Sequence, residues 1–192
     1  MVNRIILACM AWGSVFAIPA RAADPPPSRV EVRAAPLAVQ PGKRIPVGIR
    51  FSMDPGWHTY AADPGDSGMP PAITVKGPPG LHIETWKFPP AKTFRDAAGT
   101  TYGYEHEVVL LGAVHLPPSL KDGESADLTF AIDWLVCKEV CVPLESTVSL
   151  RLTIGTPEMA DRLVWERFLE AGGWSACTET QTGTVVPEKE IP

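Results

Sequence analysis

Two cysteines near the middle of the chain have the spacing of a thiol–disulfide exchange site. Cys137 and Cys141 are separated by Lys138, Glu139 and Val140. A fully extended chain would place their Cα atoms about 13 Å apart, whereas a disulfide needs Cα atoms roughly 5.5–6 Å apart. The pair can therefore bridge only if the intervening residues fold back as a turn. A bond that closes so short a loop adds only about 2 kcal/mol to stability, which favours redox exchange over a structural staple.

The spacing alone leaves two other uses of the pair open. One is a locked structural disulfide in a non-catalytic binding module. The other is a site for a soft ion such as Cu(I), which thiolates bind together with Met or His. The metal interpretation is the weaker one, because no ligand spacing is visible among the four histidines, which are His58, His82, His106 and His115.

Charged and aromatic residues near the pair could tune its reactivity. Lys138 would favour a thiolate and Glu139 would oppose it. His58 lies in the aromatic stretch Trp57–Tyr60 and could act as an acid or base if the fold brings it close. A lone histidine among aromatic residues is more often a packing residue, so the sequence leaves both roles for His58 open.

The elements that must position the turn are predicted to be strands. Apolar residues alternate from Ile45 to Met53 and from Leu128 to Val136, which is the period of half-buried strands. The 21 prolines and 16 glycines lie between such runs and indicate turns. Two long loops are expected, at 63–71 and 89–101. We predict an all-β, immunoglobulin-like sandwich with about eight strands, at 30–39, 45–53, 57–60, 72–75, 81–88, 108–116, 128–137 and 148–154.

The two ends of the chain are predicted to lie outside the sandwich. Residues 1–22 have the charged, apolar and small-residue regions of a signal peptide cleaved after Ala22, so Cys9 would be removed. An amphipathic helix is predicted for 156–172, with Thr156 as N-cap and Pro157 in its first turn. Residues 173–192 are predicted to be a flexible tail, in which Cys177 is either an incidental thiol or an intermolecular link.

The charge and the hydropathy of the chain argue against nucleic-acid binding and against a transmembrane helix. The net charge is −5 and no basic patch is present, so nucleic acid is not expected as a ligand. No stretch after residue 22 approaches the roughly 20 apolar residues of a transmembrane helix. The mature chain is therefore expected to be exported without a membrane span.

Several motifs, taken in order, resemble the disulfide bond corrector family, which is related to the N-terminal periplasmic domain of the thiol:disulfide interchange protein DsbD. The motifs lie within residues 28–155 and are Asp54–Tyr60, Asp63–Gly68, Tyr102–Tyr104 and Trp134–Pro143. The resemblance implies an immunoglobulin-like domain with a redox-active cysteine pair, no cofactor and a periplasmic location. It also implies a protein-disulfide reductase activity.

The resemblance assigns roles to particular residues. Cys141 would be the attacking thiol and Cys137 the resolving one. His58 and Tyr60 match positions where two aromatic residues flank the active site. The loop before Tyr102 corresponds to a cap that shields the disulfide, with Thr101 or a neighbour in place of the aromatic cap residue.

The resemblance also implies partners. In DsbD, electrons pass from a membrane domain through a thioredoxin-like domain to this module, and from there to periplasmic disulfide proteins. This sequence has neither of those other domains, and its cysteines are closer together than in the best-known DsbD. We therefore expect separate thioredoxin-like or membrane electron-carrier proteins to supply its electrons.

Overall fold

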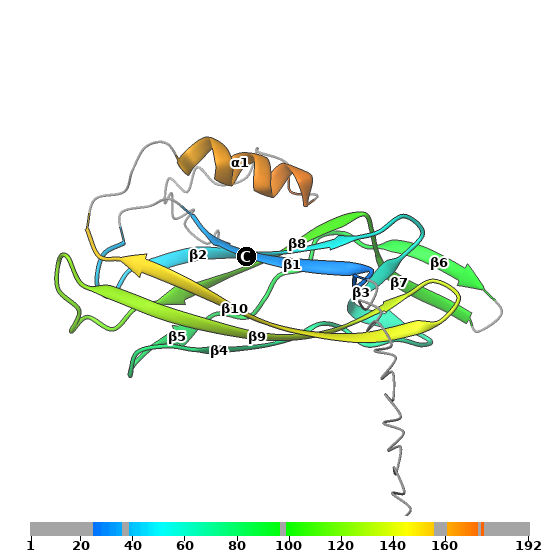
Figure 1. The fold of residues 1–192 in the computed structure, drawn as a ribbon, viewed down its shortest axis with the longest axis horizontal. Coiled ribbons are helices and arrows are strands. Elements are labelled where there is room, and N and C mark those ends of the chain that lie inside the picture. The colour runs from blue at the N-terminus through cyan, green and yellow to red at the C-terminus, as the bar shows by residue number, and fades with distance from the viewer. Residues whose placement is uncertain (1–24, 36–38, 97–98, 156–160, 173, 175–192) are drawn as a thin grey trace, which may run out of the picture.

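The computed structural model describes residues 25–35, 39–96, 99–155, 161–172 and 174. They form two antiparallel sheets packed face to face (Figure 1). The four-stranded sheet has the order β1 (Ser28–Ala34), β2 (Arg44–Met53), β8 (Glu107–His115) and β5 (His82–Ile83). The six-stranded sheet has the order β10 (Cys141–Thr153), β9 (Ser125–Cys137), β3 (His58–Gly65), β7 (Gly99–Glu105) and β6 (Lys92–Asp96), with β4 (Ala72–Lys76) also paired to β9. The predicted all-β sandwich is confirmed.

The core lies between the sheets and follows from the alternation in the sequence. Successive side chains of a strand point to opposite faces, so every second residue of β2 and of β9 enters the core. Phe51 of β2 and Trp134 of β9 meet there edge to face, with ring centroids 5.7 Å apart. Trp134 also donates its indole N–H to the hydroxyl of Ser28 on β1, 3.2 Å away. These two contacts of Trp134 join the two sheets three residues before Cys137.

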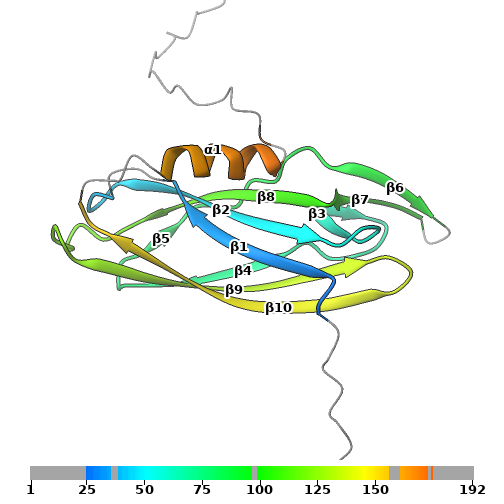
Figure 2. The same cartoon turned by 45° about the horizontal axis from the view of Figure 1, so that its top comes forward.

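One predicted loop is wrong. The segment 89–101 contains β6 and the start of β7, which pair from Lys92↔Gly103 to Asp96↔Gly99. Polar and apolar residues alternate only weakly in Lys92–Asp96, and this segment lacks the apolar run that marks a buried strand. The sequence pattern therefore does not reveal β6. The backbone hydrogen bonds of a hairpin stabilise it instead. This hairpin projects at one end of the sandwich (Figure 2).

Other strand boundaries also differ from the prediction. β3 continues through Gly65, into the segment predicted as a loop at 63–71. The strand predicted at 81–88 is reduced to β5 and an isolated bridge between Lys87 and Leu111. β1 ends at Ala34. β10 begins at Cys141 itself, seven residues before the predicted start, because it pairs residue by residue with β9. The described residues thus form ten strands.

A helix, α1 (Asp161–Ala171), covers the outer face of the four-stranded sheet (Figures 1 and 2). Phe168 is buried between α1 and β2, where the absence of a side chain at Gly48 makes room for its ring. The guanidinium groups of Arg33 and Arg50 lie 5.9 and 5.3 Å from the ring centroid, within the range of cation–π contacts. The predicted helix caps Thr156 and Pro157, residues 1–22 and Cys177 lie outside the described residues.

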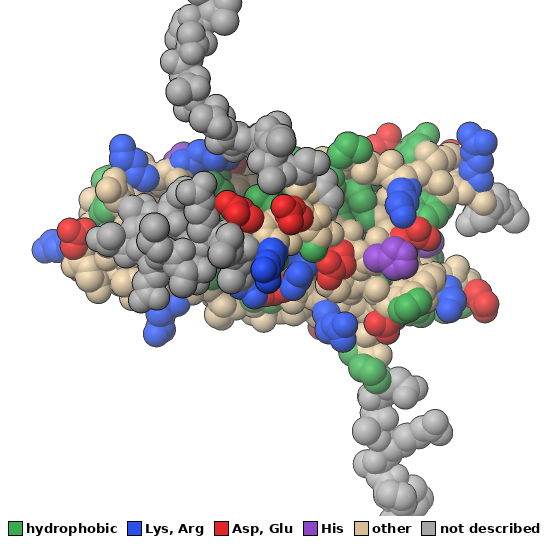
Figure 3. All heavy atoms as spheres, turned by 90° about the horizontal axis from the view of Figure 1, so that it is seen from above, with side chains coloured by type: hydrophobic (Ala, Val, Ile, Leu, Met, Phe, Trp, Pro, Cys, Tyr) green, Lys and Arg blue, Asp and Glu red, His purple; other side chains and the backbone are tan. Residues whose placement is uncertain are grey.

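The surface on the α1 side carries both signs of charge. Figure 3 shows Lys and Arg side chains interspersed with Asp and Glu over this face, without a field of one sign. Within the described ranges, no helix is both long and apolar enough to cross a membrane.

Candidate functional site

The two cysteines form a disulfide at the turn between β9 and β10. Cys137 is the last residue of β9, Cys141 is the first of β10, and they are direct register partners with Cα atoms 4.1 Å apart. The amide of Lys138 donates to the carbonyl of Val140 across the turn, 3.2 Å away. The fold-back that the spacing requires is therefore present, and the sandwich supplies it by pairing the two longest strands.

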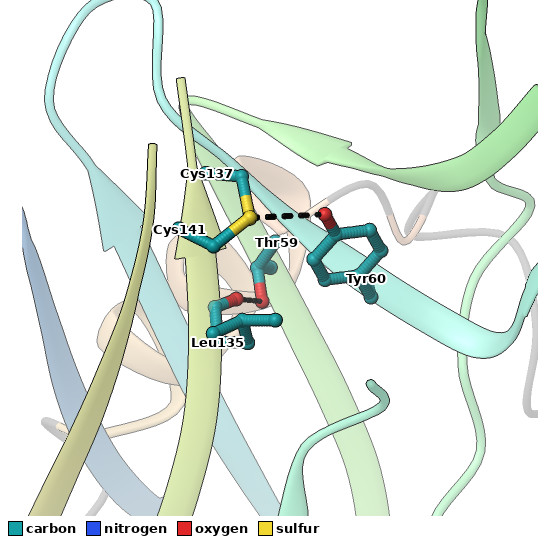
Figure 4. The surroundings of a disulfide bond; sticks show 5 residues. All are labelled: Thr59, Tyr60, Leu135, Cys137 and Cys141. Atoms are coloured by element: carbon teal, nitrogen blue, oxygen red, sulfur yellow. Dashed lines mark hydrogen bonds between the residues drawn. A yellow bond between two sulfur atoms is a disulfide. The ribbon is translucent and has the colours of Figure 1, made fainter. Parts of the chain in front are cut away.

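The two sulfur atoms have different surroundings. Cys137 is 4% exposed, whereas Cys141 lies on the exposed side of the edge strand β10. The Tyr60 hydroxyl donates a hydrogen bond to Cys137 Sγ at 3.0 Å and lies 3.8 Å from Cys141 Sγ (Figure 4). Cys141 is thus the more solvent-exposed cysteine of the pair, while Cys137 is enclosed and has the shorter hydrogen bond to Tyr60.

The position of Tyr60 is fixed from several sides. The buried Thr59 hydroxyl donates to the carbonyl of Leu135 on β9, 3.0 Å away, which holds β3 beside the cysteine strand (Figure 4). Gly68, at φ 96°, lies against the Tyr60 ring so closely that a Cβ there would be 2.1 Å from a ring carbon. Because Tyr60 is 4% exposed and its ring packs against Gly68, its hydroxyl is held in place toward the sulfur.

His58 and Phe94 extend this aromatic group. His58 is the register partner of Cys137 in β9 and of Glu105 in β7. Its ring lies edge-on to Tyr60, with centroids 5.4 Å apart, and stacks on Phe94 with centroids 4.7 Å apart. The hairpin of β6 and β7 is therefore connected to the disulfide through three consecutive rings.

The base of the hairpin is anchored to the sandwich. Tyr104 donates its hydroxyl hydrogen bond to the carbonyl of Pro89, 2.7 Å away, and burial raises the pKa of Tyr104 to about 12. Lys92 forms an ion pair with Glu105 at 3.2 Å. Phe94 is therefore presented to His58 by an element that is fixed at its base.

The remaining residues suggested by the sequence lie less close to the sulfur atoms. Lys138 is exposed, and its side chain lies across Gly56 in the turn before β3. Tyr102 is 37% exposed and pairs with Thr93, and no described hydrogen bond or ring contact joins it to either cysteine. Val140, at the tip of the turn, is 66% exposed. Among the described residues no group of three or more His, Cys, Asp or Glu is arranged to hold a metal ion.

The sequence reasoning missed Phe94 and Gly68. Phe94 lies in the segment predicted as a loop, and only its pairing with Thr101 places it on the face of His58. The resemblance placed Thr101 or a neighbour at the cap. Thr101 is buried, and the aromatic residue of this hairpin that contacts the site is Phe94. A glycine such as Gly68 in Asp63–Gly68 can indicate that another part of the chain packs closely against the backbone, but the sequence does not indicate that this part is the Tyr60 ring.

Comparison with solved structures finds the same fold. The N-terminal periplasmic domain of ScsB from Proteus mirabilis is 23% identical, with a TM-score of 0.54, and the match covers 79% of this chain and 56% of that one. This chain thus spans little more than half the length of that structure. Two structures from Neisseria meningitidis also match: the reduced DsbD N-terminal domain (22% identity, TM-score 0.35, 67% and 86% covered) and its complex with the PilB N-terminal domain (20%, 0.37, 72% and 94%).

The comparison of sequences is more specific than that of folds. No curated protein sequence is similar enough to count as a relative. The family described as "Thiol:disulfide interchange protein DsbD, N-terminal" matches residues 27–153, which include all ten strands and both cysteines of the disulfide. The chain therefore belongs to the family of the DsbD N-terminal domain, which relays electrons through a cysteine pair.

Proposed function

We propose that this chain is a periplasmic thiol–disulfide exchange module that transfers two electrons at a time through Cys137 and Cys141. The observation that carries the proposal is the asymmetry of the disulfide: Cys141 is an exposed residue, whereas Cys137 is buried and its sulfur is the one closer to the Tyr60 hydroxyl, at 3.0 Å against 3.8 Å. A disulfide that only staples the fold never has a leaving sulfur for this hydroxyl to stabilise. A disulfide that is opened from one side needs such a donor at the leaving sulfur.

The loading reaction follows from this geometry. A thiolate of the electron donor attacks Cys141 Sγ and forms a mixed disulfide, and the electron pair of the broken S–S bond moves to Cys137 Sγ. The Tyr60 hydroxyl stabilises that thiolate, because hydrogen bonds to charged acceptors are the stronger ones. The donor's second thiolate then attacks its own sulfur in the mixed disulfide. This step releases Cys141 as a thiolate and leaves the donor oxidised.

The delivery reaction uses the same roles in reverse. The Cys141 thiolate attacks a disulfide of the acceptor protein and expels one acceptor thiolate. Cys137 then attacks Cys141 Sγ, which expels the second acceptor thiolate and restores the Cys137–Cys141 bond. Two electrons pass to the acceptor, and its two thiolates take up protons from solvent. Cys141 is thus the attacking residue and Cys137 the resolving one.

The neighbouring side chains have supporting roles in this proposal. His58 and Phe94 form a wall beside Tyr60 that limits access to the buried sulfur. Lys138 adds a positive charge to the turn, which favours an approaching thiolate. Tyr102 is exposed on the same hairpin and is available to contact a bound protein.

The partners that we propose are proteins rather than small molecules. Thioredoxin-like or membrane electron-carrier proteins would load the pair, and periplasmic disulfide proteins would receive the electrons. The complex of a Neisseria meningitidis DsbD N-terminal domain with the PilB N-terminal domain supports protein partners for this family. We also propose export with cleavage after Ala22, which N-terminal sequencing of the exported protein would test.

Trapping of mixed disulfides tests the proposal. Cys137→Ser keeps the attacking thiol but removes the resolving one, so it should accumulate covalent complexes with other proteins under oxidising conditions. Cys141→Ser should form none and is the matched control, provided that both variants also carry Cys177→Ser, so that this third thiol cannot form links of its own. Non-reducing gels followed by mass spectrometry measure both. The proposal is wrong if neither variant traps a partner, or if the wild-type couple has a potential below about −300 mV, the range of structural disulfides.

A further inference from the structure

Two histidines lie side by side at the end of the sandwich away from the disulfide. His82 of β5 and His115 of β8 are direct register partners, and their ring centroids are 5.6 Å apart. β8 starts at Glu107, beside the end of β7, and His115 is its last residue. At about 3.3 Å per residue, this strand separates the two ends by roughly 25 Å. Figures 1 and 2 show β5 at one end of the molecule and the β6–β7 hairpin at the other.

The ring of His115 is held by a carboxylate. His115 Nε2 is 2.8 Å from Glu84 Oε1, and both oxygens of Glu84 accept hydrogen bonds from Arg44, at 2.9 and 3.0 Å. The two parallel hydrogen bonds from the Arg44 guanidinium identify Glu84 as an ionised carboxylate. An ionised carboxylate only accepts hydrogen bonds, so Nε2 of a neutral His115 carries the proton and Nδ1 carries the lone pair.

This arrangement is the one that proteins use behind metal-binding histidines. A ligating imidazole almost always donates its other N–H to a carboxylate or carbonyl, which fixes the tautomer and the ring orientation. The Glu84 backbone is itself anchored, since its amide donates to the carbonyl of Ala113 at 2.9 Å. Glu84 also neutralises Arg44, which would otherwise repel a cation bound next to His115.

We propose that His82 and His115 form a binding site for one divalent transition metal ion that prefers imidazole, with Zn²⁺ as the representative ion. Metal–nitrogen bonds of roughly 2.0–2.1 Å place the centroids of two rings that share a tetrahedral ion about 5 Å apart. The separation of 5.6 Å is close to that value. His82 is exposed and the side chain of His115 is 33% exposed. Water can therefore complete the coordination, since the described residues supply no third ligand.

Calorimetric titration with Zn²⁺ tests the site. The full-length protein is used with its disulfide intact and its free thiols alkylated, so that no cysteine competes for the ion. The wild type should bind one Zn²⁺, and His82→Ala and His115→Ala should each weaken binding at least tenfold. Glu84→Gln should weaken it by about tenfold, the lower end of the range for carboxylates behind ligating histidines. His106→Asn, at an exposed histidine with φ 65° that Asn tolerates, should bind like the wild type.

NMR of the imidazole groups identifies the ligands directly. One equivalent of Zn²⁺ should shift the ring signals of His82 and His115 and leave those of His58 and His106 in place. The proposal is overturned if the signals of other histidines shift instead, or if the alanine variants keep wild-type affinity. Neither experiment depends on thiol exchange, so its outcome is independent of the function proposed for the disulfide.

Discussion

The hydroxyl of Tyr60 should control how fast the disulfide opens. Tyr60→Phe removes the donor that lies 3.0 Å from Cys137 Sγ but keeps the buried ring that packs on Gly68. A hydrogen bond to a charged group contributes about 1.5–3 kcal/mol. If half or more of that is present when the S–S bond breaks, the loss is about 1.4 kcal/mol, or a factor of about ten in rate. Reduction of the variant should therefore be about tenfold slower.

The same loss should change the redox equilibrium. Without the hydroxyl, a Cys137 thiolate loses its hydrogen-bond donor, so the reduced form loses stability relative to the disulfide. For a two-electron couple about 1.4 kcal/mol corresponds to 30 mV. At a pH where Cys137 is a thiolate, the potential of Tyr60→Phe should be about 30 mV more negative than that of the wild type.

Acid-quenched alkylation followed by mass spectrometry measures the rate of reduction by dithiothreitol, and glutathione buffers give the potential. Tyr102→Phe is the matched control, because it makes the same chemical change at an exposed tyrosine with no described bond to the sulfur atoms. Urea unfolding should show at most the 0.5–1.5 kcal/mol of one ordinary hydrogen bond. Wild-type rate and potential in Tyr60→Phe would show that Tyr60 only packs beside the disulfide.

Three further predictions concern stability and are measured by urea unfolding. Gly68→Ala should destabilise the oxidised protein more than Gly123→Ala. Both glycines have positive φ, but only a Cβ at Gly68 would collide with a ring, that of Tyr60. Equal losses of unfolding free energy in the two variants would show that the Tyr60 ring moves aside at little cost. Phe168→Ala should cost about 3–5 kcal/mol, since Phe168 is the buried anchor of α1, and a loss under 1 kcal/mol would contradict that role. Glu84 has a pKa of about 2 in the folded protein against an ordinary 4.5, so its contribution is complete above pH 4.5 and is lost as the pH falls toward 2. The stability difference between wild type and Glu84→Gln should shrink over that range, and a difference independent of pH would refute the assignment.

The local pattern of the sequence predicted the strands that carry the core. The runs from Ile45 to Met53 and from Leu128 to Val136 alternate strictly, and each became a long strand with its apolar residues buried. Alternation reports burial on one face, which is a property of neighbouring residues. It could not reveal β6, whose Lys92–Asp96 segment has one apolar residue and is stabilised by its pairing with β7.

The candidate site was predicted in part. The spacing of the cysteines required a turn, and the fold supplies it where β9 meets β10. His58 and Tyr60 were named from a resemblance, and their alternation along β3 puts both on the face of the cysteine pair. Phe94 is far from them in sequence. Its stacking on His58 depends on the register of β6 against β7 and of β7 against β3, which no single segment specifies.

The sequence by itself determined that two cysteines would be held at a turn between strands of a sandwich, because spacing and alternation are local properties. Only the tertiary structure decided which cysteine is buried, since Tyr60, which contacts Cys137 Sγ, comes from another strand. It also decided that His82 and His115 meet. They are 33 residues apart and show no pattern along the chain, yet the register between β5 and β8 places their rings side by side.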